Sequence, residues 1–275
     1  MKNKLVSYLV LLCMVIMFSF SYANELPIES NVPGGIVIVS IKSKDRPKAF
    51  FYDKKVLVVG ETQNWKAIIG IPLKIELGEH KLKVISNGTE ANYLFEVVNK
   101  DYESQYLTIK NKRQVNPNEK DMLRISKERK LISKTKRNWR QIDNVPLNFI
   151  KPAKGPFSSA FGLRRFFNNQ PRNPHSGLDI AAKTGTPIVA PAAGIVTNAG
   201  DYFFNGKTVF LDHGQGLITM YCHMEKIDVK EGDIVNTNDM IGTIGSTGRV
   251  TGAHLHWSVY LNNTTVEPLL FLKTN

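Results

Sequence analysis

Short apolar runs of strand length, separated by glycine-containing turns, make up the last part of the chain. The turns include Asp212-His213-Gly214 and Glu231-Gly232-Asp233. Many short strands joined by tight turns favour a compact all-β domain. We therefore expect one all-β domain over residues 150–275. Its runs lie at residues 188–189, 194–197, 208–211, 217–222, 241–244 and 254–261.

Residues 24–100 show a similar pattern, with turn sequences such as Pro33-Gly34-Gly35 and Asn87-Gly88 between the runs. Short strands with regular turns predict a small β-sandwich. No set of residues suggests chemistry there, because His80 stands alone and is best interpreted as a surface histidine. The runs lie at residues 36–41, 56–59, 66–70, 81–85 and 93–97.

Residues 101–149 differ in composition from both neighbouring regions. No Gly or Pro occurs from Asn118 to Arg140, and scattered apolar residues among Lys and Arg predict a helix with a weak apolar stripe. The segment carries 12 basic and 6 acidic residues, against 11 and 9 in each neighbouring region. A solvated, basic helical connector is the favoured interpretation. A surface that attracts an anionic polymer or a membrane is the alternative.

The overall charge and the N-terminus limit the class of protein. A net charge of +12 admits nucleic acid, an acidic polymer or a membrane surface as partners, and two cysteines exclude a disulfide scaffold. Lys2 and Lys4 precede an apolar run over residues 5–20, and Ser21-Tyr22-Ala23 offers a cleavage site. This pattern predicts a secretory signal peptide, residues 1–23. An uncleaved anchor is less favoured because a span needs about 20 apolar residues.

Five of the six histidines fall in the predicted C-terminal domain, and two of them share a strand. Because side chains alternate along a strand, His254, His256 and Ser258 share one face. Apolar residues occupy the opposite face, so we expect the histidines to look into a groove. The five are His175, His213, His223, His254 and His256.

A second strand repeats the arrangement in residues 219–223. By the same alternation, Thr219, Tyr221 and His223 share a polar face. Cys222 then faces the other way, as a small buried residue and not a metal ligand. Surface histidines on a polar sheet face are the alternative, which becomes weak when two strands of one domain show the pattern.

The segment His175-Ser176-Gly177-Leu178-Asp179 adds a histidine and a carboxylate four residues apart. Catalytic zinc takes three such protein ligands and keeps a fourth position for water. Two neutral imidazoles and one carboxylate leave the site with a net positive charge, which lowers the pKa of bound water toward about 7. The sequence therefore predicts a zinc site, although spacing alone does not say which histidines are ligands.

At these residues the chain resembles the lysostaphin-type zinc metallopeptidases, which cut the peptides of peptidoglycan. The resemblance spans roughly residues 155–270. Residues 24–100 resemble the β domain that precedes this catalytic domain in some Gram-negative members. The matching motifs are Phe161-Gly162-Leu163-Arg164, His175-Ser176-Gly177-Leu178-Asp179, His213-Gly214-Gln215-Gly216, Thr219-Met220-Tyr221-Cys222-His223, Gly232-Asp233-Ile234-Val235, Gly245-Ser246-Thr247-Gly248 and Gly252-Ala253-His254-Leu255-His256.

The resemblance assigns roles to individual residues. It implies one zinc ion held by His175, Asp179 and His256. His223 and His254 become the catalytic histidines. Three further residues are candidates for substrate binding, and residues 165–174 are a candidate groove wall. The three are Arg164, Tyr221 and His213.

The implied activity is zinc-dependent hydrolysis of an amide bond in peptidoglycan stems or crosslinks, with the crosslink between D-alanine and diaminopimelate fitting best. Trimming of uncrosslinked stems by a carboxypeptidase is one alternative. A non-enzymatic, wall-binding activator of other hydrolases is another. The expected partner is peptidoglycan, with no nucleic acid and no stable membrane insertion after signal cleavage. The expected location is the periplasm or envelope of a Gram-negative bacterium.

We also hypothesise that the N-terminal region lies over the zinc groove and keeps the enzyme latent. The layout motivates this, because a β domain and a helical connector both precede the site. The complete predicted organisation is mainly β. It consists of a signal peptide (1–23), a β-sandwich (24–100), a basic helical connector (101–149) and an all-β metallopeptidase domain (150–275).

Overall fold

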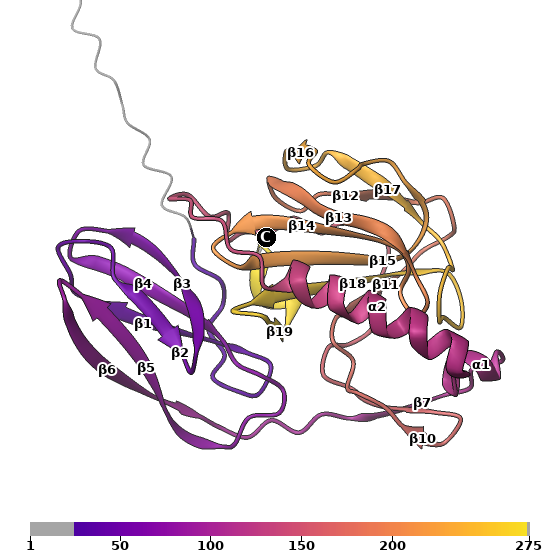
Figure 1. Cartoon of the computed structure of the whole chain (residues 1–275), viewed down its shortest axis with the longest axis horizontal. Coiled ribbons are helices and arrows are strands. Elements are labelled where there is room, and N and C mark those ends of the chain that lie inside the picture. The colour runs from indigo at the N-terminus through magenta and orange to yellow at the C-terminus, as the bar shows by residue number, and fades with distance from the viewer. Residues whose placement is uncertain (1–24, 274–275) are drawn as a thin grey trace, which may run out of the picture.

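The computed structural model describes residues 25–273, so the predicted signal peptide lies outside the described residues. Two β units stand side by side, and a helix lies against the C-terminal one (Figure 1). The mainly β fold class, with an N-terminal β domain, a short helical connector and a C-terminal β domain, is confirmed. Within residues 25–273, no helix is long and apolar enough to cross a bilayer.

The N-terminal unit is a six-stranded antiparallel sheet in the order β1-β4-β3-β2-β5-β6. The sheet packs around its own apolar cluster, to which both β1 and β5 contribute through Val37 and Val84. Five of the strands contain the predicted runs, and β2 is the strand that the sequence did not suggest. The strands are β1 (Ile36–Ile41), β2 (Lys48–Phe51), β3 (Lys54–Glu61), β4 (Asn64–Gly70), β5 (Gly78–Ser86) and β6 (Thr89–Val97).

The C-terminal unit is a ten-stranded sheet whose main path runs β16-β13-β14-β15-β18-β11-β8. The predicted turn at Asp212-His213-Gly214 is instead the end of β14, and the chain reverses at Gln215 and Gly216. The strands are β8 (Phe157–Ser159), β11 (Leu178–Ala181), β12 (Pro187–Val189), β13 (Gly194–Tyr202), β14 (Gly206–Gly214), β15 (Leu217–Ile227), β16 (Ile234–Val235), β17 (Met240–Ile244), β18 (His254–Leu261) and β19 (Thr264–Val266), followed by η1 (Pro268–Phe271).

The connector contains more structure than a single helix. β7 (Ser104–Leu107) pairs in parallel with β9 (Arg164–Phe167), which also pairs with β10 (Gln170–Pro171). After the short α1 (Lys112–Val115), α2 (Glu119–Lys136) begins at a capping box formed by Asn118 and Asp121. Such a box satisfies two of the free N–H groups at a helix start.

Helix α2 is not the solvated spacer that its weak apolar stripe suggested. Ile125 is buried, and Ile132 packs against the cluster of Met220, Cys222 and Tyr260 on the C-terminal sheet. Figure 1 shows α2 lying across that sheet. The helix therefore covers one face of β15 and β18, which is where the predicted site residues lie.

The two β units share apolar core and hydrogen bonds. Ile36, Leu57 and Ile68 belong to the same cluster as the core of the C-terminal sheet. Gly70 donates its N–H to Asn262 Oδ1 at 2.7 Å, and Asn262 Nδ2 donates to the Gly70 carbonyl at 3.1 Å. A Cβ at Gly70 would lie 2.9 Å from Leu261 Cβ, so a glycine is required at this close approach.

Candidate metal and catalytic site

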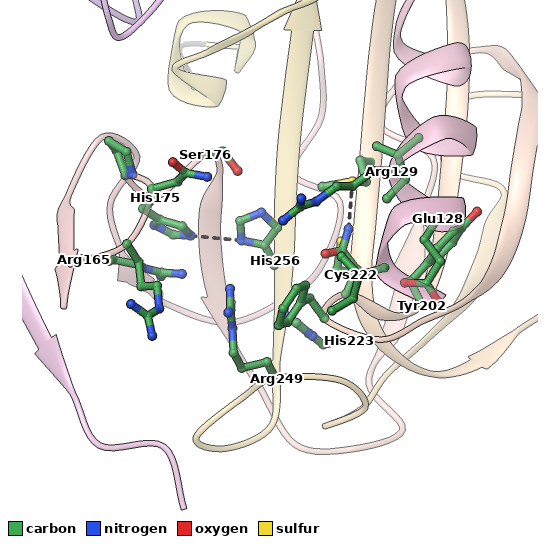
Figure 2. A pocket seen from close by; sticks show the side chains of 18 of the residues that line it. Glu128, Arg129, Arg165, His175, Ser176, Tyr202, Cys222, His223, Arg249 and His256 are labelled. Atoms are coloured by element: carbon green, nitrogen blue, oxygen red, sulfur yellow. Dashed lines mark hydrogen bonds between the residues drawn. The ribbon is translucent and has the colours of Figure 1, made fainter. Parts of the chain in front are cut away.

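A cavity of about 550 Å³ lies between α2 and the C-terminal sheet. His175, His223 and His256 line it, as Figure 2 shows. Residues of the segment 165–174, among them Arg165 and Arg172, form another wall. The expected groove wall is thus present next to the histidines.

Three ligand atoms converge at one end of this cavity. His175 Nε2 lies 2.9 Å from Asp179 Oδ1 and 2.9 Å from His256 Nδ1, and His256 Nδ1 lies 2.8 Å from Asp179 Oδ1. Asp179 on β11 and His256 on β18 are direct cross-strand partners, which places their side chains on the same face. His175 lies in the loop that leads into β11. All three side chains are buried.

Hydrogen bonds to the outer nitrogens fix how these imidazoles are oriented. His175 Nδ1 lies 2.6 Å from the Ala160 carbonyl, to which it donates. His256 Nε2 lies 3.0 Å from Ser258 Oγ and can donate to it. When His256 donates to Ser258, each ring turns a lone pair toward Asp179, and three electron-rich atoms then meet without a proton between them. Such an arrangement suits a cation, since ligand histidines usually donate their other N–H in this way.

The protonation states favour the same conclusion. Burial lowers the pKa of His175 to about 4, so the ring is neutral near pH 7. Arg165 Nη2 donates to Asp179 Oδ2 at 3.0 Å and holds the carboxylate in place. Neutral imidazole and ionised carboxylate are the forms that bind metals.

His223 and His254 lie beside the three ligand atoms of His175, Asp179 and His256. Their ring centroids are 4.9 Å apart, and His254 Nε2 is 3.9 Å from Asp179 Oδ1. His223 Nδ1 donates to the Thr247 carbonyl at 2.8 Å, and His254 Nδ1 donates to the Gly252 carbonyl at 2.9 Å. Both rings therefore keep Nε2 available to accept a proton. Burial first, and the neighbouring His254 and His256 second, hold the pKa of His223 well below its ordinary value.

The predicted faces of β18 hold, whereas those of β15 are reversed before His223. Leu255 and Trp257 pack in the main core, opposite His256. On β15, Tyr221 pairs with Trp257 and faces the core, while Cys222 pairs with His256 and lines the cavity. His223 then has a positive φ of 64° within an irregularity of the strand pairing, and its side chain also reaches the cavity. A bulge of this kind interrupts strict alternation.

The three candidates for substrate binding lie elsewhere. Tyr221 and His213 are fully buried, and each hydrogen-bonds to Thr219 Oγ1, at 2.7 and 2.8 Å. Burial lowers the pKa of His213 to about 4, so it is a neutral core residue. Arg164 is exposed and does not line the cavity. The assignment of these three residues to substrate binding stays a prediction, and their positions in the structure do not support it.

Sequence reasoning missed Arg249 at the cavity and included Arg165 only as part of the candidate groove wall, without a role of its own. Arg165 follows Arg164 on β9, so strand alternation alone would have placed the two on opposite faces. Arg249 directly follows the motif Gly245-Ser246-Thr247-Gly248. No rule of spacing connects either arginine to the histidines, because the connection is made through the fold.

The fold and the site define a β protein with a buried histidine–aspartate cluster that is able to hold a metal ion, and with two adjacent imidazoles. The sequence profile of peptidase family M23 matches residues 173–268, and that of the peptidase family M23 N-terminal domain matches residues 29–100. A crystal structure from Pseudomonas aeruginosa, described as an M23 peptidase, is 41% identical, with a TM-score of 0.76, and the match covers 89% of this chain and 96% of that one. The chain belongs to peptidase family M23, and the resemblance seen in the sequence is confirmed.

Curated relatives match parts of the chain, and two of them illustrate the similarity. The DD-carboxypeptidase/endopeptidase Mpg of Neisseria meningitidis serogroup B is 38% identical over 112 residues, which are 41% of this chain and 26% of that protein. The peptidoglycan DD-endopeptidase ShyC of Vibrio cholerae is 42% identical over 94 residues, 34% of this chain and 22% of that protein. The matched segment thus spans about a quarter of the length of these relatives.

Proposed function

We propose that this chain is a zinc metallopeptidase that hydrolyses amide bonds in the peptide part of peptidoglycan, in particular the crosslink between D-alanine and diaminopimelate. The convergence of three lone pairs within 2.9 Å of one another carries the proposal. Family membership supports it, and so do the two similar proteins whose names state DD-endopeptidase activity. In a purely structural histidine cluster, hydrogen-bond donors would face acceptors, and three acceptor atoms would not meet at the centre.

One zinc ion would be held by His175, Asp179 and His256, whose nitrogen and oxygen atoms belong to the usual zinc ligand set. When bound there, zinc supplies a Lewis acid that polarises a carbonyl and lowers the pKa of bound water. Arg165 keeps Asp179 ionised and oriented through its hydrogen bond to Oδ2. The described residues provide no sulfur ligand in this set, which argues against a copper or iron–sulfur centre.

His223 and His254 would handle the protons of the reaction. His223 is neutral and keeps its Nε2 lone pair, so it can accept the proton of the attacking water. The imidazolium that results can return a proton to the leaving amine. His254, with its Nε2 also free, can take part in the same exchange or orient the carbonyl oxygen once protonated. Help of this kind contributes about 100- to 10,000-fold to a rate.

The proposal is tested with purified residues 24–275 on isolated peptidoglycan, with and without a chelator. Products are identified by mass spectrometry, and bound zinc is counted in the same sample. We expect chelator-sensitive loss of crosslinked dimers. His80→Ala is a matched control, because His80 lies on the N-terminal sheet and hydrogen-bonds only locally to Tyr52 and Glu76.

Two other results would redirect the proposal. Shortened monomers with the dimers left intact would identify a carboxypeptidase. Bound zinc without cleavage would favour the wall-binding activator.

Export to the periplasm or cell envelope is part of the same proposal, since the substrate lies there. N-terminal sequencing of the protein recovered from a periplasmic extract tests it. A first residue at position 24 supports cleavage after Ala23, and an intact N-terminus would support an anchor.

Latency is proposed in a narrower form than the sequence suggested. The described residues that line the cavity begin at Val115, so the connector borders the cavity and the N-terminal sheet does not. Gln114 Nε2 donates to the Gly248 carbonyl at 2.8 Å, and Arg172 Nη2 donates to the Val115 carbonyl at 3.0 Å. The connector thus bridges two cavity walls. If it restrains access, Gln114→Ala should raise the cleavage rate, and an unchanged rate would contradict latency.

A further inference from the structure

The cavity wall carries an excess of positive charge. Its basic side chains include Arg165, Arg172 and Arg249, and further along α2 Arg129 and Lys136. The acidic residue on the described wall is Glu128. Its carboxylate is already engaged by Arg124 at 2.6 Å and by the Phe203 N–H at 2.9 Å. The positive charge of the wall therefore favours the binding of an anionic group in the cavity.

Arg249 differs from the other two arginines near the histidines because its hydrogen-bonding groups are largely unused. Arg165 is paired with Asp179, and Arg172 donates to Val115, Gln170 and its own neighbour. Arg249 makes one long hydrogen bond, from Nη1 to the Gln114 carbonyl at 3.4 Å. None of the ion pairs among residues 25–273 involves Arg249.

Two aromatic rings hold the Arg249 guanidinium in place. The Phe167 centroid is 4.6 Å from its Cζ, and the Phe204 centroid is 4.3 Å away. Contact with the two rings uses none of the N–H groups of the guanidinium, which stay free for a partner. In Figure 2 the side chain points toward His256.

The charge of Arg249 lacks a counter-ion but persists at neutral pH. Burial, then the nearby Arg165 and Arg172, lower its pKa to about 10. A carboxylate that entered the cavity would relieve this repulsion and could form two parallel hydrogen bonds with the fork of N–H groups. Lysine, a point charge with no planar edge, would not reproduce the bidentate geometry.

We propose that Arg249 binds a carboxylate of the substrate, namely the one on the residue whose amine is released by cleavage. The inference rests on the proposed function. In a crosslink between D-alanine and diaminopimelate, a free carboxylate sits on the carbon next to the scissile nitrogen. A group that holds this carboxylate, in the same cavity as the three converging donors, would position the amide and select the substrate. Arg249 is thus a specificity-determining residue.

The test uses two synthetic crosslinked peptides, one with this carboxylate free and one with it converted to a carboxamide. Cleavage of both by the zinc-loaded protein is compared for wild type, Arg249→Gln, Arg249→Lys and the control Arg137→Gln. Arg137 is exposed at the end of α2 and is not one of the residues that line the cavity. Zinc content and thermal unfolding are recorded for each variant.

We expect wild type and Arg137→Gln to prefer the free carboxylate by about 10- to 100-fold in kcat/KM, the effect of a hydrogen-bonded charge pair. Arg249→Gln should lose the preference, because its kcat/KM for the free carboxylate should fall to that for the carboxamide. Arg249→Lys should retain a small part of it. Equal cleavage of both peptides by wild type, or an undiminished preference in Arg249→Gln, would overturn the proposal.

Binding separates this inference from the proposed function. Calorimetry with the His223→Ala protein, and with the same protein carrying Arg249→Gln, measures the affinity for both peptides without turnover. Tighter binding of the free carboxylate that depends on Arg249 would support the subsite even if wild type cleaved neither peptide. Binding that ignores the carboxylate would contradict the subsite even if cleavage were efficient.

Discussion

The two β units of this chain bury very different kinds of side chain. Within residues 25–100, the buried polar group is Ser43, and the remainder of the core is apolar. The described C-terminal unit buries imidazoles, carboxylates, hydroxyls and amides within and around its sheet. They are His175, Asp179, Thr208, Asp212, His213, Gln215, Thr219, His223, His256, Ser258 and Asn262.

The difference teaches how to distinguish a structural polar group from one that awaits a ligand. Burying a polar group without a partner is costly, so most are paired within the protein. His213 has partners for both ring nitrogens, the Ala193 carbonyl and Thr219. His256 instead turns one nitrogen toward two other acceptors, His175 and Asp179. The partner that is needed there is a cation.

The largest expected effect comes from removing a ligand. His256→Ala should abolish both zinc binding and cleavage, because His175 and Asp179 supply only two of the three protein ligands that a catalytic zinc needs. Metal analysis and the peptidoglycan assay measure the two losses, with circular dichroism as the check on folding. Zinc retained at one ion per chain would show that His256 is not a ligand and would transfer that role to His254.

The next effect comes from the two imidazoles that lie beside the predicted zinc ligands. His223→Ala and His254→Ala should each keep zinc and lose about 100- to 10,000-fold in kcat. Both proteins are measured for zinc content and for single-turnover cleavage. Loss of zinc from His254→Ala would reverse the assignment within the pair His254 and His256.

A substitution in the apolar unit should separate stability from chemistry. Ile69→Ala empties a fully buried position in the N-terminal core and should lower the free energy of unfolding by about 2–5 kcal/mol. Denaturant titration measures the loss. We expect zinc content and kcat at low temperature to match wild type, and a parallel fall in zinc affinity would mean that the two units are coupled.

The smallest expected effect concerns a residue that acts through another. Arg165→Gln removes the charge beside Asp179 Oδ2, and we expect about a 10- to 100-fold weaker zinc affinity, typical for partners of metal ligands. Competition with a chromophoric chelator measures the affinity. Arg165→Lys should restore part of it. An unchanged affinity in Arg165→Gln would leave Arg165 without a positioning role.

Local pattern was sufficient for much of the fold, whereas the choice of His175, Asp179 and His256 as predicted ligands came from the resemblance, because spacing alone left it open. The alternation along β18 correctly separated His256 from Leu255 and Trp257, because that strand is regular. The same rule failed on β15, since the bulge at His223 adds a residue that alternation does not count. Only the three-dimensional structure reveals such an irregularity.

The roles of the connector and the arginines could not be read from the sequence for a different reason. α2 buries Ile125 and packs Ile132 on the sheet. An apolar stripe this narrow does not show from the sequence whether the helix packs on the domain or is solvated. Arg165 and Arg249 come from distant segments and meet through β9 and the loop before β18. Long-range placement of charged side chains leaves no local periodicity to detect.

The paired hydrogen bonds between Gly70 and Asn262 have a consequence for recombination between relatives. Two separate profiles match the β units, which suggests that the units are interchangeable modules. The junction limits this freedom, because Gly70 and Asn262 come from different modules and satisfy each other's buried amide groups. A chimera that contains Gly70 without Asn262 would leave the backbone N–H and carbonyl of Gly70 without their hydrogen-bond partners at the junction. Exchange should therefore succeed mainly between parents that share both residues.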